Sequence, residues 1–177
     1  MKLLTAKLVR SACAASIALA LFGSVGCEPA IDPKVVELKK QFIVTEEPAS
    51  PLTIEAAIQE VANQPEVTLV GRINAGASEP FDAGQATMVL SEVPEPGHNH
   101  DPGDCPFCKR RAENAKSCIV RFLDQDGNVI KLGAQQLLGV AKDQDVVVKG
   151  RGVFLPEVDV LQVDATAVYV RPPESKL

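Results

Sequence analysis

The sequence predicts a mainly β protein, in which a helical arm precedes a five-stranded Greek-key barrel with a short helix between the third and fourth strands. Three observations lead to this prediction. Five runs are rich in β-branched residues, and Gly, Pro, Asp and Asn bound each of them. One short apolar segment of helix-forming composition separates the third run from the fourth.

The segment 1–26 has the layout of an export signal. A basic start is followed by an apolar run of about 15 residues, which is shorter than the roughly 20 that cross a bilayer. The final Ser24-Val25-Gly26-Cys27 resembles a bacterial lipoprotein signal, in which the cysteine becomes the acylated first residue of the mature chain. The resemblance implies a lipid anchor at Cys27, on the periplasmic or outer face of the cell envelope. Ordinary cleavage near Gly26 is the alternative.

The charge of the mature chain argues against a nucleic-acid partner. Removal of the signal leaves 27–177, which is enough for one domain with its own core. It also removes three of the 18 basic residues and none of the 23 acidic ones, which leaves a net charge of −8. The chain has no Trp and one Tyr. Nucleic-acid binding needs cations against phosphate and aromatic faces for stacking, so we expect none.

The segment 27–66 is predicted to be a tether and a helical arm. Asp32-Pro33 is a favourable helix start, because it combines an N-cap acceptor with a proline whose missing N–H costs nothing there. After the break "EEPASP", four apolar residues recur at the spacing of one helix face: Ile54, Ala57, Ile58 and Val61. We expect this face to pack against the domain that follows.

The segment 67–171 contains the predicted barrel, and 172–177 form a tail. Asp126-Gly127 predicts a hairpin-type turn that extends or returns the third strand. The segment "AQQLLGVA" supplies the short helix. The five expected strands are 67–74, 85–92, 117–124, 145–152 and 158–171.

Five strands with a helix between the third and fourth are the order of an OB-fold. "LVGRIN", with its Gly71-Arg72 bend, and "LLGVAKDQDVVVKGRG" resemble the OB-fold domains of small exported bacterial proteins. The resemblance covers roughly 67–171 and implies a small Greek-key barrel. Within it, Gly71 and Gly150 are expected to relieve crowding where a strand coils sharply.

A long insertion, 92–116, interrupts the predicted barrel between the second and third strands. Loops longer than about 12 to 15 residues without structure of their own are usually functional or disordered. This one contains "GHNHDPGDCPFCKRR", which holds both histidines of the chain and two of its five cysteines. The insertion is therefore the candidate functional site.

The spacing His98-x-His100-x4-Cys105-x2-Cys108 predicts a metal site. A C-x2-C pair lets two thiolates converge on one ion, and histidines at i and i+2 of an extended segment project to the same side. Two sulfurs and two nitrogens form a tetrahedral zinc set, and Cys118 replacing one histidine would give a Cys3His set. Copper is the alternative metal. The cations of Lys109-Arg110-Arg111 would lower the pKa of the thiolates.

Other roles for these residues remain open at the level of sequence. Without Cys13 and Cys27, three cysteines are left, an odd number in an oxidising compartment. A disulfide from Cys105 or Cys108 to Cys118 would pin the loop. "DCPFCK" also resembles the C-P-x-C of glutaredoxin-like enzymes, with Asp104 as N-cap, although the βαβ context is missing. Haem attachment is disfavoured because Lys109 stands where C-x-x-C-H needs histidine.

Acidic residues surround the histidines and could orient them or add an oxygen ligand: Glu92, Glu95, Asp101 and Asp104. Together these patterns favour a non-enzymatic binding or interaction module at the cell envelope, with a structural zinc-type site and an unspecified protein partner. The competing expectation is a thiol-disulfide or copper-handling protein that uses the Cys105/Cys108 pair.

Overall fold

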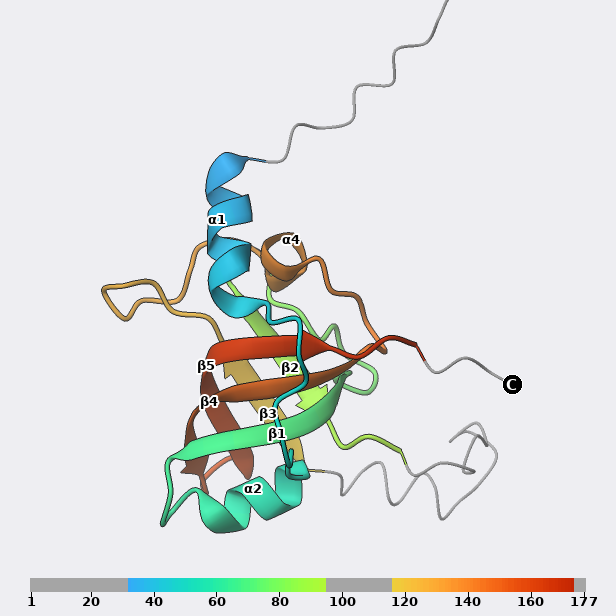
Figure 1. Cartoon of the computed structure of the whole chain (residues 1–177). Helices are drawn as coiled ribbons and strands as arrows, with labels where there is room; N and C mark the ends of the chain where they lie inside the picture. Colours follow the sequence, from blue (N-terminus) through green and yellow to red (C-terminus); the bar gives the residue numbers. More distant parts are fainter. Residues whose placement is uncertain (1–31, 95–115, 174–177) are drawn as a thin grey trace, which may run out of the picture. The chain divides into compact units, whose positions relative to one another are not determined.

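The computed structural model describes residues 32–94 and 116–173. Their fold is a closed barrel of five strands with helices at both ends (Figure 1). The predicted mainly β class, the five strands and the helix between the third and fourth of them are confirmed. The five strands are β1 (Glu66–Ile73), β2 (Thr87–Ser91), β3 (Ser117–Arg121), β4 (Asp145–Leu155) and β5 (Val160–Val170).

The strand order around the barrel is β1-β2-β3-β5-β4, and β4 pairs back with β1. All pairs are antiparallel except β3 with β5. This is the Greek-key arrangement of an OB-fold. The long strands β4 and β5 pair along nearly their whole length, whereas β2 and β3 are short.

Strict alternation of side chains fills the barrel. In β1 the residues at 67, 69, 71 and 73 are buried and those between them are more exposed, and β3 alternates in the same way. The described residues bury no polar or charged side chain, and the largest interior groups include Phe122, Leu69 and Met88. The interior is thus a packed apolar core.

Two helices close the barrel ends. At one end lies α4 (Ala134–Leu138), between β3 and β4, with Leu137 and Leu138 in the core. The other end is covered by α2 (Ile54–Glu60), which packs against β1 and buries Ile54 and Ala57. Thr53 caps α2 by accepting a hydrogen bond from the Ala56 N–H.

The first helix, α1 (Pro33–Phe42), lies against α4 and β5. Asp32 is its N-cap and accepts a hydrogen bond from the Lys34 N–H at 2.9 Å, as the Asp32-Pro33 pattern predicts. At the other end Phe42 is buried, and its ring meets Phe122 edge to face, with centroids 5.1 Å apart. The first helix of the arm therefore belongs to the same core as the barrel.

The segment 43–53 forms a strap from α1 to α2 across the outside of the barrel (Figure 1). Ile43 bridges to Val168 in the part of β5 beyond its pairing with β3, and Leu52 bridges to Leu69 in the part of β1 that β2 leaves open. Val147 lies two residues before the exposed Lys149, so the alternation of the strand places its side chain on the outer face of the barrel, and yet it is fully buried. The strap thus pairs with both open strand edges and crosses the sheet where that apolar side chain faces outward.

Two of the predicted turn and glycine positions have a clear physical basis. At Asp126-Gly127 the chain reverses, with Gly127 at φ +80° and the Asp124 carboxylate accepting from two backbone N–H groups, and Val129 returns beside Leu123. At Gly150 the pairing of β4 with β5 shifts register, and an added Cβ would lie 2.3 Å from the Asp164 carbonyl oxygen. Only glycine fits that approach.

Candidate functional site

Of the five predicted metal ligands, the structure describes one. His98, His100, Cys105 and Cys108 lie outside the described residues, as does the predicted lipidation site Cys27. Cys118 lies on β3 and is described. The structure therefore shows the strands that carry the insertion and the position of the third cysteine.

The two ends of the insertion are held side by side. β2 and β3 are antiparallel neighbours, and Ser91, the last residue of β2, is the register partner of Ser117, the first of β3. On its other side, Ser91 is paired with Arg72 of β1. The segment 92–116 thus leaves the barrel and returns to it at one point, and the barrel closes without it.

Each flank of the insertion has its own anchor. The Glu92 carboxylate accepts a hydrogen bond from the Glu55 N–H, in the first turn of α2, at 2.8 Å. Lys116 forms an ion pair with Asp159 in the turn between β4 and β5. The base of the insertion is consequently fixed at the α2 end of the barrel. Glu92 was expected to lie beside the histidines, but its carboxylate binds the backbone of α2. The sequence around Glu92 does not indicate this contact, because Glu55 is far from it in the chain.

Cys118 faces the interior of the barrel. Its side chain is 0% exposed, and its register partners are Leu90 of β2 and Leu161 of β5. Burial in this apolar surrounding raises the pKa of the thiol well above its usual range. Such a thiol packs as a small apolar group, because a thiolate would be poorly solvated there.

The position of Cys118 changes which cysteines are available for a disulfide or a metal. If Cys13 and Cys27 are set aside, three cysteines remain, and a single disulfide would leave one of them unpaired. With Cys118 in the core, Cys105 and Cys108 remain as an even pair within one C-x2-C motif. The sequence does contain a signal for this position. Apolar side chains alternate along the strand at Cys118, Val120 and Phe122, which indicates that all three face the interior of the barrel.

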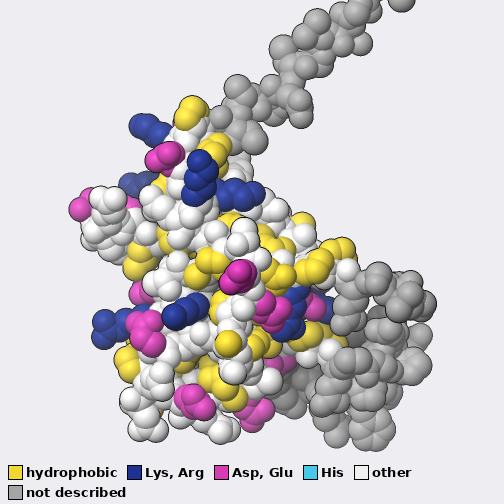
Figure 2. Space-filling model, in the orientation of Figure 1, with side chains coloured by type: hydrophobic (Ala, Val, Ile, Leu, Met, Phe, Trp, Pro, Cys, Tyr) yellow, Lys and Arg dark blue, Asp and Glu magenta, His cyan; other side chains and the backbone are white. Residues whose placement is uncertain are grey.

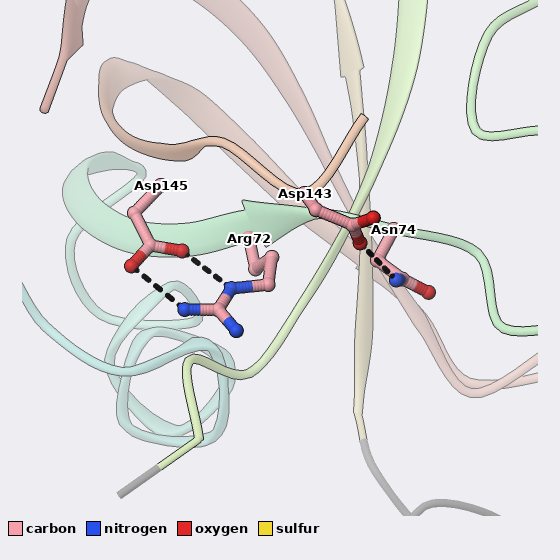
Figure 3. Close-up of polar contacts among 4 residues, drawn as sticks. All are labelled: Arg72, Asn74, Asp143 and Asp145. Carbon is pink, nitrogen blue, oxygen red and sulfur yellow. Dashed lines mark hydrogen bonds and ion pairs between the residues drawn. The ribbon is translucent and has the colours of Figure 1, made fainter. Parts of the chain in front are cut away.

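Polar side chains cluster where β1 meets the start of β4 (Figure 3). Arg72 donates from Nε and from one terminal nitrogen to the two carboxylate oxygens of Asp145, at 2.7 and 3.0 Å. The Asn74 amide donates to the Asp143 carboxylate at 2.7 Å. A bidentate Arg–carboxylate pair neutralises both partners and ties β1 to β4. The carboxylates of Asp143 and Asp145 therefore have a structural role, because each is paired with a side chain of the β1 segment.

Within 32–94 and 116–173, no group of three or more His, Cys, Asp or Glu side chains is arranged to hold a metal ion.

An open hollow of about 420 Å³ lies on the outer face of β2 and β3, where Phe81 stands beside Val89 and Ile119. No helix of the described chain is long and apolar enough to span a bilayer.

The comparisons with known proteins identify no family. No family model matches the chain, and no curated protein matches it. One solved structure that the search matches to this chain is the aspartyl tRNA synthetase from Entamoeba histolytica, at 12% sequence identity and a TM-score of 0.42. The match covers 73% of this chain and 25% of the synthetase, so the chain spans about a quarter of that protein's length.

Proposed function

We propose that the chain is a non-enzymatic binding or interaction module of the bacterial cell envelope, with a structural zinc-type site in the insertion between β2 and β3. The observation that carries the proposal is the base of the insertion. Ser91 and Ser117 are register partners, and Glu92 and Lys116 fix the flanks on either side. A barrel that closes without the insertion leaves it available for a separate role, and a metal would order it locally.

The ligand set that fits best is Cys105, Cys108, His98 and His100. Two thiolates and two imidazoles satisfy the tetrahedral preference of Zn²⁺ and leave no open position for a reactive water, which suits a structural site. Cys118 fits less well than the sequence alone indicated. Its thiol faces the core, and turning it toward the insertion would break the alternation of β3 and leave a cavity beside Leu161.

The envelope location rests on the export signal expected in 1–26 and on the lipidation expected at Cys27. Acylation of that cysteine would hold the mature chain at a membrane surface through lipid chains, since the apolar run of the signal is too short to span. Asp32, where the described chain begins, is five positions beyond Cys27. The barrel would therefore stand close to the membrane.

A second candidate is a thiol-disulfide or copper-handling protein that uses the same two cysteines. The observation that favours it is the burial of Cys118, because the remaining pair can close as one Cys105–Cys108 disulfide with no thiol left over. In that case the first thiol of the C-x2-C motif would be the nucleophile, activated by the neighbouring cations. Copper would suit the mixed thiolate and imidazole donors.

Metal analysis of the purified mature chain, paired with a count of reactive thiols, separates the two candidates. The proposal expects one zinc ion per chain and protection of Cys105 and Cys108 until a chelator is added. The double variant Cys105→Ser, Cys108→Ser should lose the zinc. The matched control Cys118→Ala should keep it.

The same double variant tests whether the site is structural. Because the ladder between β2 and β3 holds the base of the insertion, the barrel should keep its free energy of unfolding within about 1 kcal/mol while a protease cuts the insertion faster. A metal-free chain whose Cys105–Cys108 disulfide cycles with a reductant would instead establish the second candidate.

A further inference from the structure

The open hollow on the outer face of β2 and β3, or β2–β3 hollow, lies beside the base of the insertion. Its lining includes Val89 and Ile119, which are register partners. They lie two residues inward from Ser91 and Ser117, where the insertion is attached. Residues two apart in a strand share a face and are about 7 Å apart along it. The outer surface at the base of the insertion therefore continues directly into the hollow.

The β2–β3 hollow combines an apolar lining with acidic groups. Phe81, Val89 and Ile119 are half-buried in it, and Glu79 and Asp82 are exposed. No Lys or Arg is among the described residues that line it. A surface of this kind fits an apolar side chain that has cations next to it.

The acidic groups of the hollow are not neutralised within the described chain. None of its ion pairs engages Glu79 or Asp82. Arg121 shares the outer face of β3 with Ile119, but its guanidinium is paired with Asp164 at 2.6 Å. The negative charge of the hollow is therefore open to a cation that the described residues do not supply.

The end of the barrel that carries the insertion is acidic as well. α2 has two glutamates and no basic residue, and Glu92 is bound to its first turn. On the face that Figure 2 shows, acidic side chains lie over α2 at the bottom of the view, and Lys and Arg side chains gather around α1 at the top. A cationic segment attached at the α2 end is attracted to the barrel.

The insertion itself contains an apolar side chain followed closely by cations. Phe107 is the one large apolar side chain in 95–115, and Lys109, Arg110 and Arg111 come two to four positions later. The four acidic residues of 95–115 are separated from one another in the sequence, whereas the three cations are consecutive. This segment lies outside the described residues, and its composition is complementary to that of the hollow.

We propose that the segment 107–111 docks in the β2–β3 hollow, with Phe107 against the apolar lining and the three cations against Glu79 and Asp82. Docking holds the C-x2-C motif against the outer face of β2 and β3. The inference goes beyond the proposed zinc site and does not depend on it, because the segment keeps its apolar and cationic groups whether the motif holds a metal or a disulfide.

The attachment of the segment makes a modest contact sufficient. Arg111 is six positions before Ser117, and a chain of that length spans at most about 20 Å, whereas the hollow begins about 7 Å from the base. A segment on so short a tether has an effective concentration on the order of millimolar. Exposed ion pairs alone contribute little, so the burial of Phe107 is needed beside them.

A tryptophan at position 107 reports the contact directly, because the chain has no other tryptophan. The mature Phe107→Trp chain is titrated with acrylamide, a neutral quencher, and the quenching constant of the indole is measured. Docking protects the indole, so variants that disrupt the hollow should raise this constant.

The first pair of variants in the Phe107→Trp background tests the lining. Val89→Lys puts a cation into the hollow, where it repels the docked segment, and should raise the quenching constant about threefold or more. The matched control is Val153→Lys, because Val153 is a 51% exposed valine of β4 that does not line the hollow. It should leave the constant unchanged.

The second pair tests the charges and remains informative if Val89→Lys does not fold. Glu79→Gln with Asp82→Asn removes two exposed charges and should raise the quenching constant about twofold. The control Glu37→Gln with Asp126→Asn removes two exposed charges that do not line the hollow and should have no effect.

The possible results separate docking from its alternatives. Equal quenching in the parent and in both hollow variants overturns the docking. Protection that is lost when the chain is diluted about a hundredfold also overturns it, because the segment then occupies a second copy of the chain and not its own hollow. A metal-free chain in which the indole is protected, and is exposed by Val89→Lys, would overturn the zinc site and support the docking.

Discussion

Ser91 and Ser117 are register partners at the ends of β2 and β3, although the whole insertion, 92–116, lies between them in sequence. Their pairing continues inward through Leu90 with Cys118 and Val89 with Ile119. The insertion that contains the histidines and the C-x2-C motif is therefore attached to the barrel at one narrow base. This relationship separates the stability of the barrel from the chemistry of the insertion, and several measurable consequences depend on it.

The buried thiol of Cys118 makes stability depend on pH in a defined direction. Burial raises its pKa in the folded chain, so above about pH 8.5 the unfolded thiol loses its proton while the folded one keeps it. The unfolded state then binds fewer protons, and the free energy of unfolding falls as pH rises, by up to about 1.4 kcal/mol per pH unit.

Urea unfolding of the wild type and of Cys118→Ala, from pH 7 to pH 10, isolates this effect from the titration of lysines and tyrosine. The variant should be less stable at pH 7, because a small cavity replaces the sulfur, and the gap should narrow as pH rises. A gap that stays constant would mean that the Cys118 thiol is not buried as described.

Gly150 should not tolerate a side chain. In Gly150→Ala the new Cβ would lie 2.3 Å from the Asp164 carbonyl oxygen, so β4 and β5 must separate at the bulge. We expect a loss of about 2–3 kcal/mol in the free energy of unfolding. The control is Gly133→Ala, where nothing lies within 4 Å of an added Cβ and the change should stay below about 1 kcal/mol. Similar losses in both variants would contradict the account of the bulge.

The arm should be a stabilising part of the domain. Phe42→Ala removes a side chain that is 6% exposed and in contact with Phe122, and should cost about 3 kcal/mol. Val36→Ala, on the outer face of the same helix, should cost less than about 0.5 kcal/mol. Equal and small effects in thermal or urea unfolding would show that α1 contributes nothing to the core.

Arg72 and Asp145 should be energetically coupled. Their bidentate pair joins β1 to β4, with side chains 33% and 22% exposed. A double-mutant cycle with Arg72→Gln and Asp145→Asn should give a coupling of about 1 kcal/mol that decreases in high salt. No coupling at low salt would contradict the observed geometry.

The barrel could be predicted from the sequence because its signals are local. β-branched runs, turn residues and the Asp32-Pro33 start each act within a few residues, and together they predict the succession of strands and helices along the chain. The closure of the barrel followed from the resemblance to an OB-fold. Gly71 and Gly150 were also predicted to relieve crowding, and an added Cβ at Gly71 would lie 2.9 Å from the Leu90 Cβ.

The remaining features depend on register and on contacts between distant segments. The strap bridges Ile43 to Val168 and Leu52 to Leu69, and nothing in the sequence of 43–53 indicates which strand edges stay open. The contact of Glu92 with α2 likewise joins two segments that are far apart in the sequence. For Cys118, the apolar alternation of its strand was present in the sequence, but the nearby cysteines and histidines suggested a ligand, which the packing of the core disfavours.

X-ray absorption at the zinc edge, on the mature chain as purified, tests the central claim most directly because it counts the atoms that bind the metal. The account predicts two sulfur ligands at about 2.3 Å and two nitrogen ligands at about 2.0 Å, with an identical spectrum for Cys118→Ala. Three sulfurs that fall to two in Cys118→Ala would place that cysteine in the site, and a chain with no bound metal would contradict the account altogether.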